Sequence, residues 1–376
     1  MAPDRRASNG ESPPPETLRP SLRSRMRLPF WLRRPRLLVR GVRNDRERPD
    51  LDRLAAIDDP MDFVWAILPH AARTFATSIL MLPAAQARTA AVGYLYCRML
   101  DTYEDLSDDD HREPALEAFA ARMATLGPPP PVPMTAGDDR DRVHLLLVQR
   151  CHLVDQVLVT LPATERQNIT YLVQAMAEGM VWSSRRFMEQ GGVLVDAGQL
   201  SRYCHNVIGG PILFTLSLVV NAELTAGQHR DALAASELIQ LANITRDVER
   251  DLERSIAYHP SLLPHLGSTD APGPIGEARR KLMAHALPHA SAYTRLAEQL
   301  TAGRFSLTRA SAVLMLLHTD RHYRWCARRI GHPSWPGLDR TGTIILASLL
   351  AAFSRRWSHR VMRRVEHDFL AAAEAI

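Results

Sequence analysis

Lysine is almost absent from this sequence of 376 residues, and Lys281 is its single example. Nearly all of the 46 basic residues are therefore arginines. The sequence contains no Gly-Lys-Ser/Thr segment, which excludes a P-loop nucleotide site. Schiff-base chemistry would depend on Lys281 alone, so that class of enzyme is set aside.

Cysteine is also scarce, and long apolar runs are missing. The four cysteines are far apart and form no Cys-x-x-Cys pair, which suits neither a disulfide framework nor a zinc site. The N-terminus has no apolar segment after its charges, so no secretory signal is indicated. The longest apolar runs are 207–220 and 341–353. Both are shorter than a transmembrane helix, which needs about 20 residues to cross a bilayer. We expect both to be buried core helices of a cytoplasmic protein.

Aromatic residues make up only 6% of the chain, whereas Ala, Leu and Arg are common, and this composition favours helices over strands. The net charge of +5 is concentrated at one end. Residues 1–50 hold 13 Arg against 6 Asp and Glu, so the rest of the chain is slightly acidic in sum. A nucleic-acid-binding domain carries a basic surface of its own, and we therefore expect no nucleic-acid partner.

The chain divides into a tail and one large domain. Residues 1–50 are rich in Arg, Pro and Ser without a lasting period, which predicts a disordered tail. Residues 51–376 show apolar spacing typical of successive helices, and we predict a single all-α domain. The proline-rich stretch 127–139 predicts a loop insertion. The predicted helices span 61–75, 84–105, 113–126, 140–161, 164–189, 199–221, 226–254, 275–301, 307–330 and 341–373.

Glycines interrupt two of these predicted helices. Gly179 lies within 164–189, and Gly209, Gly210 and Pro211 should bend the helix over 199–221. Two explanations stay open for both positions, namely tight packing between helices and room for a bound chain.

Two predicted helices carry Asp residues four positions apart. Asp101 and Asp105 form the first pair, and Asp247 and Asp251 form the second. This spacing places both carboxylates of a pair on one helix face, a turn apart. Two such faces turned toward each other could hold Mg²⁺ through oxygen ligands, and the metal could bridge to a diphosphate. A solvent-facing helix gives the same spacing, so that alternative stays open.

Arginines accompany both acidic pairs. Arg98 precedes Asp101 by one helical turn, and Arg246 directly precedes Asp247. Asn243 continues the face of the second pair toward the N-terminus. Metals and guanidinium groups together are suited to hold diphosphate, because each neutralises different phosphate oxygens.

Four segments resemble the squalene/phytoene synthase family of head-to-head prenyltransferases, and the bacterial squalene synthase-like proteins most closely. They fall in the family's order across roughly residues 59–330. The first is Arg73-Thr-Phe-Ala, and the second runs from Tyr94 through Arg98 and Asp101 to Asp105. The third is Tyr203-Cys-His-Asn-Val-Ile-Gly-Gly, and the fourth runs from Asn243 to Asp251, followed by Tyr-His-Pro at 258–260.

The resemblance implies an all-α domain around a deep cavity that binds two prenyl diphosphates. It assigns diphosphate binding to Arg73, Arg98 and Arg246. It assigns Mg²⁺ binding to four aspartates and a supporting asparagine (Asp101, Asp105, Asp247, Asp251 and Asn243). Tyr203 would lie near the reacting carbons, and Tyr94 is a second candidate catalytic residue. Two farnesyl diphosphates would give presqualene diphosphate and then squalene, with NADPH as reductant, or dehydrosqualene.

The second acidic segment departs from the family pattern. Arg250 stands where the family usually has Glu, and Ser255-Ile256 stands where it has Gly-Arg. This puts the second half-reaction or the second substrate in doubt. Two further activities therefore stay open, namely phytoene synthesis from geranylgeranyl diphosphate and cyclisation of one prenyl diphosphate. A non-catalytic relative should have lost its aspartates, and all four are present.

Arginine-rich ends of the chain suggest peripheral attachment at the inner membrane surface. The basic N-terminal tail and five arginines of the C-terminal helix (Arg355, Arg356, Arg360, Arg363 and Arg364) could contact anionic lipid. A solvated helix face and a solvated tail are the alternative explanations.

Overall fold

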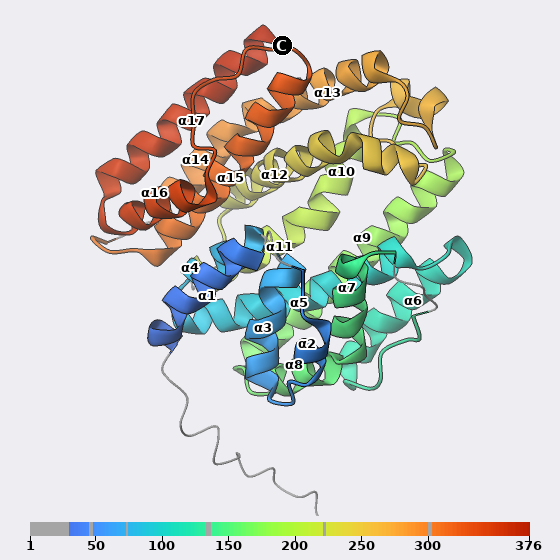
Figure 1. The fold of residues 1–376 in the computed structure, drawn as a ribbon, viewed down its shortest axis with the longest axis vertical. Coiled ribbons are helices and arrows are strands. Elements are labelled where there is room, and N and C mark those ends of the chain that lie inside the picture. The colour runs from blue at the N-terminus through green and yellow to red at the C-terminus, as the bar shows by residue number, and fades with distance from the viewer. Residues whose placement is uncertain (1–29, 45–47, 73, 133–136, 221–222, 300–302) are drawn as a thin grey trace, which may run out of the picture.

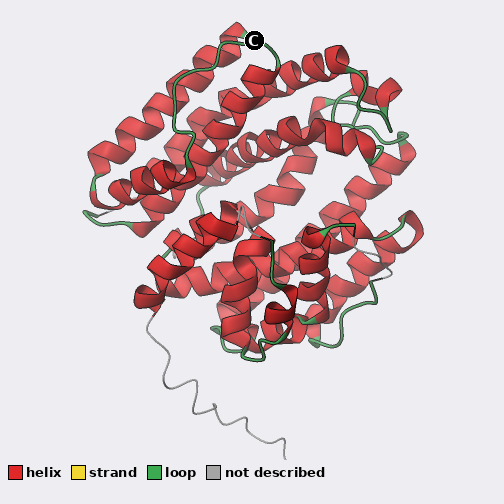
Figure 2. Ribbon diagram, viewed as in Figure 1, coloured by secondary structure: helices red, strands yellow, loops and turns green. Residues whose placement is uncertain are grey.

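The computed structural model describes residues 30–44, 48–72, 74–132, 137–220, 223–299 and 303–376. These described residues form helices and loops and no β-strand, as Figure 2 shows, and this confirms the all-α prediction. The helices are α1 (Phe30–Asn44), α2 (Leu51–Ala55), α3 (Pro60–Ala72), α4 (Thr74–Met81), α5 (Ala84–Leu106), α6 (Asp109–Ala121), α7 (Asp139–Gln149), α8 (Cys151–Leu158), α9 (Ala163–Glu189), α10 (Ala197–Cys204), α11 (Gly210–Val220), α12 (Ala226–Glu253), α13 (Pro272–Ala286), α14 (Ala290–Gln299), α15 (Leu307–Arg329), α16 (Thr341–Phe353) and α17 (Arg355–Ala375).

Short segments of other helix types lie between these helices. Three are 3₁₀ turns, namely η2 (Arg122–Ala124), η4 (Pro260–His265) and η5 (Leu287–His289), and η3 (His205–Gly209) is a π-helical turn. Several predicted helices are divided in the structure. The predicted helix 140–161 corresponds to α7 and α8, and the predicted helix 341–373 corresponds to α16 and α17. Apolar periodicity misses such a break, since both halves keep an inward-facing stripe.

Helix α1 corrects part of the disorder prediction for residues 1–50. It packs on α3 and α4, and Leu37 is buried there. Arg33 pairs with Asp62 at 2.9 Å, and Arg34 donates a hydrogen bond of 2.9 Å to the carbonyl of Leu82. The prediction was therefore wrong for 30–44, where these tertiary contacts offset the arginine-rich composition. Residues 1–29 lie outside the described part, and disorder there stays a prediction.

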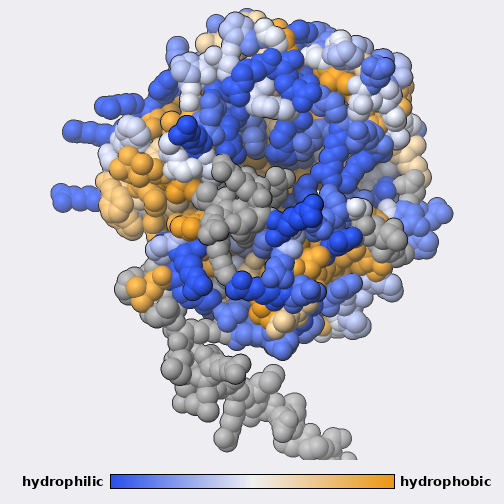
Figure 3. Space-filling view, viewed as in Figure 1, coloured by the Kyte–Doolittle hydropathy of each residue, from blue (hydrophilic) through white to orange (hydrophobic). Residues whose placement is uncertain are grey.

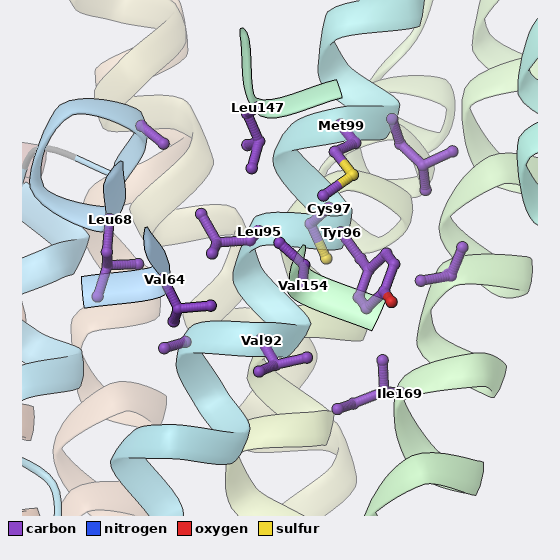
Figure 4. Close-up of a cluster of buried hydrophobic side chains, with 14 of the residues drawn as sticks. Val64, Leu68, Val92, Leu95, Tyr96, Cys97, Met99, Leu147, Val154 and Ile169 are labelled. Atoms are coloured by element: carbon purple, nitrogen blue, oxygen red, sulfur yellow. The ribbon is translucent and has the colours of Figure 1, made fainter. Parts of the chain in front are cut away.

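Most of the buried apolar side chains belong to two large cores, and a smaller third cluster lies between the end of α12 and the start of α13. One joins α3–α9, and Figure 4 shows its centre, where Leu95 and Tyr96 of α5 meet Val154 and Ile169. The other joins α10–α17. Figure 1 shows the N-terminal helices gathered in one half and α12–α17 in the other, with α10 and α11 between them. A cavity lies between the two halves and is lined by helices of both.

Gly179 of α9 serves close packing between helices. Helix α9 continues through Gly179, where an added Cβ would lie 2.5 Å from the Cβ of Asn206 in the π-helical turn. The predicted bend at Gly209 takes the form of that π turn. Of the two explanations left open, tight packing therefore accounts for Gly179. It fixes the distance between α9 and the segment that follows Tyr203.

Two apolar runs predicted as core helices are only partly buried. Within the described residues, 197–220 is the one helical stretch long and apolar enough to cross a membrane, by length and composition alone. Many of its apolar side chains instead line the cavity. Helix α16 buries one face through Ile344 and Ala351, whereas Leu346, Leu350 and Phe353 are exposed.

Candidate active site

The cavity between the two cores has a volume of about 570 Å³. It is within the usual size range of small-molecule sites. Nine of the ten predicted site residues line it (Tyr94, Arg98, Asp101, Asp105, Tyr203, Asn243, Arg246, Asp247 and Asp251). The tenth, Arg73, lies outside the described residues. Residues from three separate sequence segments thus meet in one space.

Helix α5 presents the first ladder, which we define as Asp101 and Asp105. Arg98 Nη1 lies 2.9 Å from Asp101 Oδ2, and Arg98 Nη2 donates a hydrogen bond of 2.9 Å to the hydroxyl of Tyr94. Thus the i, i+3 and i, i+4 neighbours of Arg98 hold its guanidinium group at the cavity wall. Its Nε atom is buried without an acceptor in the described part of the chain, so one N–H remains available to a ligand.

Helix α12 presents the second ladder, Asp247 and Asp251. The guanidinium group of Arg246 binds Asp247 through two hydrogen bonds, of which the Nε–Oδ1 bond is 2.8 Å long. Burial tends to raise the pKa of Asp247, but the bonds from Arg246 outweigh it and leave that pKa below its usual value. Asn243 lies one turn earlier and donates a hydrogen bond of 3.3 Å to Gln240.

The two ladders face each other at one end of the cavity. Arg254, at the end of α12, pairs with Asp105 of α5 at 2.8 Å. Burial raises the pKa of Asp251 to about 7, and the charges of Asp247 and Asp105 contribute to the rise. A carboxylate of one ladder therefore experiences the charge of the other. The prediction of two acidic faces turned toward each other agrees with this geometry.

The charge balance of this end fits divalent metal ions. Burial raises the pKa of Asp101 to about 6, and Asp105 adds to the rise while Arg98 opposes it. Burial, Asp101 and Asp105 likewise raise the pKa of Glu104 well above its usual value. Among the described residues, Asp251 has no ion pair with a basic side chain. Clustered carboxyl groups with raised pKa values mark excess negative charge, which cations bound through oxygen would offset.

Aromatic side chains lie beside the ladders. The hydroxyl of Tyr258 donates a hydrogen bond of 3.0 Å to that of Tyr203, and Phe187 packs edge-on against both rings. Burial raises the pKa of Tyr203 and of Tyr258 well above the usual value. Both phenols are therefore neutral at physiological pH and present oxygen dipoles toward the acidic end. On α5, the ring of Tyr94 packs at a tilt against that of Phe75, with the ring centroids 5.7 Å apart.

Sequence reasoning missed several residues of this lining. Arg140, at the start of α7, lines the cavity, and its charge opposes the rise in the pKa of Asp101. Nothing in the sequence near 140 relates it to the ladders, because its position depends on how α7 packs on α5. Tyr258 belongs to the Tyr-His-Pro segment at 258–260, but the spacing of that segment does not predict its hydrogen bond to Tyr203. His318 of α15 also lines the cavity, and the sequence did not predict this position.

His318 gives a prediction about acid stability. The side chain is buried, and neither ring nitrogen has a hydrogen-bond partner among the described residues. Burial, together with the charges of Arg321 and His322, lowers its pKa to about 3. An unfolded histidine titrates near pH 6.5, so the unfolded chain binds a proton that the folded chain does not. Stability contributed by neutral His318 is therefore lost as pH falls from about 6.5 toward 3.

We expect His318→Gln to weaken the decline in the free energy of unfolding between about pH 6.5 and pH 4. Urea unfolding at several pH values measures this slope. His152→Gln is the matched control, because His152 is exposed on α8. A slope equal to that of the wild type would contradict the assignment.

The end of α12 explains one departure from the family pattern. The amide of Ile256 donates to the carbonyl of Asp251 and that of Ser255 to the carbonyl of Leu252, both at 2.9 Å. This is the Schellman arrangement, in which the residue at Ser255 adopts a left-handed conformation. Its φ is +59°, a region that glycine occupies without strain. Ser255 therefore adopts a backbone conformation that a glycine would occupy without strain, and the hydrogen bond from Ile256 holds the Asp251 carbonyl.

Ser255→Gly is expected to stabilise the protein. Left-handed φ costs a non-glycine residue about 1 kcal/mol, so the free energy of unfolding should rise by roughly 0.5–1 kcal/mol. Chemical denaturation measures the change. Ser268→Gly serves as control, since Ser268 lies in an exposed loop without positive φ and should not gain. Destabilisation by Ser255→Gly would contradict the strain argument.

Apolar side chains make up much of the remaining lining of the cavity. They come from α4, α11, α14 and α15, among them Ile79, Ile212, Leu216, Leu296 and Met315. Acidic ladders together with apolar walls suit a ligand with a charged head and a hydrocarbon tail.

Comparison with known proteins agrees with this geometry. A family model described as squalene/phytoene synthase matches residues 68–332, which is more than half of the chain. No curated protein matches the chain. A solved complex of TcSQS with the ligand BPH1237 is 18% identical, with 85% of this chain and 99% of that chain covered and a TM-score of 0.60. A complex of TcSQS with E5700 has the same identity and coverage and a TM-score of 0.63.

At this level of identity, the solved structures show a shared fold. The family model carries the assignment, because it spans all four motif segments from 73 to 260. Its members are prenyltransferases that join prenyl diphosphates head to head and generally depend on divalent metal. Together, the match and the cavity with its two ladders identify this chain as a member of the squalene/phytoene synthase family.

Proposed function

We propose that this prenyltransferase condenses two farnesyl diphosphates head to head, in a Mg²⁺-dependent reaction, to presqualene diphosphate and then to squalene or dehydrosqualene. The observation that carries the proposal is the meeting of two acidic ladders, on α5 and α12, at one end of an apolar cavity. Each ladder has its own arginine, which suits a site for two diphosphates.

In this proposal, the arginines hold the diphosphate groups. Arg98 has a buried Nε–H without an acceptor in the described part of the chain, which a phosphate oxygen would satisfy. Arg246 lies beside the second ladder, and Arg73 has the same role by resemblance alone. Bound Mg²⁺ would neutralise the charge that develops on the leaving diphosphate. Its ligands would come from both ladders, with Asn243 in support.

The remaining residues position the hydrocarbon parts and exclude water. Loss of diphosphate leaves an allylic cation, which the double bond of the second substrate must reach before water does. The apolar walls from α11, α14 and α15 serve this purpose. Tyr203, held by Tyr258, and Tyr94, held by Arg98, direct hydroxyl dipoles toward the reacting carbons. Neutral phenol oxygens stabilise a nearby cation without capturing it as a carboxylate would.

Product analysis by mass spectrometry tests the proposal. The purified protein is incubated with farnesyl or geranylgeranyl diphosphate, with Mg²⁺ or with a chelator. We expect a C30 product from farnesyl diphosphate that disappears with the chelator. A preference for geranylgeranyl diphosphate with a C40 product would instead favour phytoene synthesis. A product with a single prenyl unit would favour cyclisation.

NADPH distinguishes the two C30 products. Loss of diphosphate from presqualene diphosphate gives a second cation. Its reduction to squalene consumes a hydride from NADPH, whereas its conversion to dehydrosqualene requires loss of a proton. Among the described residues that line the cavity, we assign none to the binding of NADPH. The reaction run with and without NADPH decides whether squalene appears.

We also propose peripheral attachment to the inner membrane surface, with the C-terminal region as the contact. Leu346, Leu350 and Phe353 of α16 are exposed, and Phe353 stacks on the exposed Phe305 at 5.1 Å. Figure 3 shows apolar atoms gathered at the edge where α16 lies in Figure 1. The exposed arginines 355 and 356 adjoin this patch and suit anionic lipid. The basic tail 1–29 is proposed as a second contact.

Flotation with anionic liposomes tests both contacts. We expect Leu346→Ser with Phe353→Ser to reduce binding, and deletion of 1–29 to reduce it further. The deletion spares α1, which packs in the fold. Flotation unchanged by either alteration would remove that segment from this role.

A further inference from the structure

A second group of metal-ligating side chains lies outside the cavity lining. Glu237 of α12 is buried, and three imidazoles surround its carboxylate. The Nε2 atoms lie 2.9 Å away for His205, 3.1 Å for His285 and 3.5 Å for His289. These histidines come from η3, α13 and η5, so the group joins three segments to α12.

The distances within this group match a tetrahedral metal site. Zinc bound to nitrogen and oxygen at about 2.0–2.1 Å places neighbouring ligand atoms about 3.3 Å apart. The carboxylate–imidazole distances lie on both sides of that value. The ligand atoms of Glu237, His285 and His289 all lie within 4.8 Å of one another. A small closure of these three side chains would bring their ligand atoms to bonding distance of one ion. His205, whose Nε2 lies 2.9 Å from the other carboxylate oxygen, Oε1, is the candidate fourth ligand.

The local backbone supports such a closure. His285 and His289 are four residues apart across the end of α13, which places both rings on one face. Their ring centroids are 5.6 Å apart. The hydroxyl of Ser201 donates a hydrogen bond of 2.8 Å to the same carboxylate and would orient it as a ligand.

The donor set and its exposure favour a transition metal. Three imidazoles and one carboxylate suit Zn²⁺, whereas Mg²⁺ prefers oxygen ligands such as those of the ladders. The histidine side chains are 26–32% exposed, which gives an ion a path from solvent, while the Glu237 side chain is only 9% exposed. The two kinds of metal therefore have separate places in this chain.

We propose that Glu237, His205, His285 and His289 form a structural Zn²⁺ site. His205 is two residues after Tyr203, and Glu237 lies on the same helix as the second ladder. An ion held there would fasten the π-helical turn and the start of α14 to α12. Zn²⁺ would thus stabilise two of the segments that line the cavity without contacting substrate.

Titration of the full chain with Co²⁺ in excess Mg²⁺ tests the site, because Mg²⁺ occupies the ladders and tetrahedral Co²⁺ has strong visible absorption bands. We expect one equivalent of Co²⁺ to produce these bands and Zn²⁺ to remove them. Saturating Zn²⁺ should raise Tm by about 5 °C in excess Mg²⁺. Failure of the wild-type protein to give the bands would overturn the proposal without recourse to any variant.

Variants identify the ligands. The double variant His285→Asn with His289→Asn should lose the bands and the Tm rise, whereas His152→Asn with His229→Asn, at exposed positions, should keep both. Circular dichroism checks that the helices are retained. Bands that survive the first double variant would overturn the site. His205→Asn should weaken Co²⁺ binding at least tenfold, and unchanged affinity would remove His205 from the ligand set.

Discussion

Asp251→Asn is expected to lower kcat/KM roughly 10²–10³-fold, the size of effect that follows loss of one group stabilising developing charge. Asp251 is the ladder residue without an ion pair among the described residues, and its pKa of about 7 reflects burial beside Asp247 and Asp105. An amide offers a weaker oxygen ligand and no charge. Steady-state kinetics with farnesyl diphosphate and Mg²⁺ measure the loss.

The same substitution should stabilise the metal-free protein. A raised pKa means that ionised Asp251 is less favourable in the folded than in the unfolded chain, so its contribution to stability falls as pH rises from about 4 to about 7. At pH 8 the asparagine variant should therefore have a higher Tm than the wild type in the presence of a chelator. Loss of activity together with a gain in Tm separates a functional role from misfolding.

Asp270→Asn is the matched control, because Asp270 is exposed in the loop before α13. It should change neither activity nor Tm. Full activity of Asp251→Asn would show that the second ladder does not serve the reaction, and a lower Tm at pH 8 would contradict the electrostatic account.

The sequence predicted the ladders because their spacing is local. Four residues make about one helical turn, so the shared face of Asp101 and Asp105 follows from the helix itself. The contact between Arg254 and Asp105 joins residues 149 positions apart, and no local pattern contains it. The same applies to Arg140 and His318. Resemblance supplied the link between the ladders, and packing supplied the rest of the lining.

Two of the errors of prediction have a common physical cause. Composition predicted disorder for 30–44, where Leu37 finds a buried place and Arg33 finds Asp62. The apolar run 341–353 predicted a buried core helix, but the outer face of α16 is exposed at Leu346 and Phe353. In both cases the sequence indicates how readily a segment could be buried, but packing against a neighbouring helix determines which of its side chains are buried. Burial is a property of pairs of elements rather than of one segment.

The depth of the cavity should set the length of the prenyl chain, and Ala312 is the residue to test. The Tyr323 hydroxyl donates a hydrogen bond of 2.7 Å to the carbonyl of Leu238, and Cys326 Sγ one of 3.6 Å to Thr245 Oγ1. Helix α15 therefore runs beside α12 in the same direction. Ala312 lines the cavity several turns before the level of Asp247, which places it away from the ladders.

We expect Ala312→Trp to shift the preference of the enzyme from farnesyl toward geranyl diphosphate. The indole would fill space that the end of the longer chain needs, and apolar misfit of this kind changes kcat/KM by about 10–200-fold. The ladders lie at the other end, so Mg²⁺ dependence should stay as in the wild type. Ala371→Trp, at an exposed position of α17, is the matched control. Equal losses with both substrates would mean that Ala312 does not set chain length, because a depth limit penalises the longer chain alone.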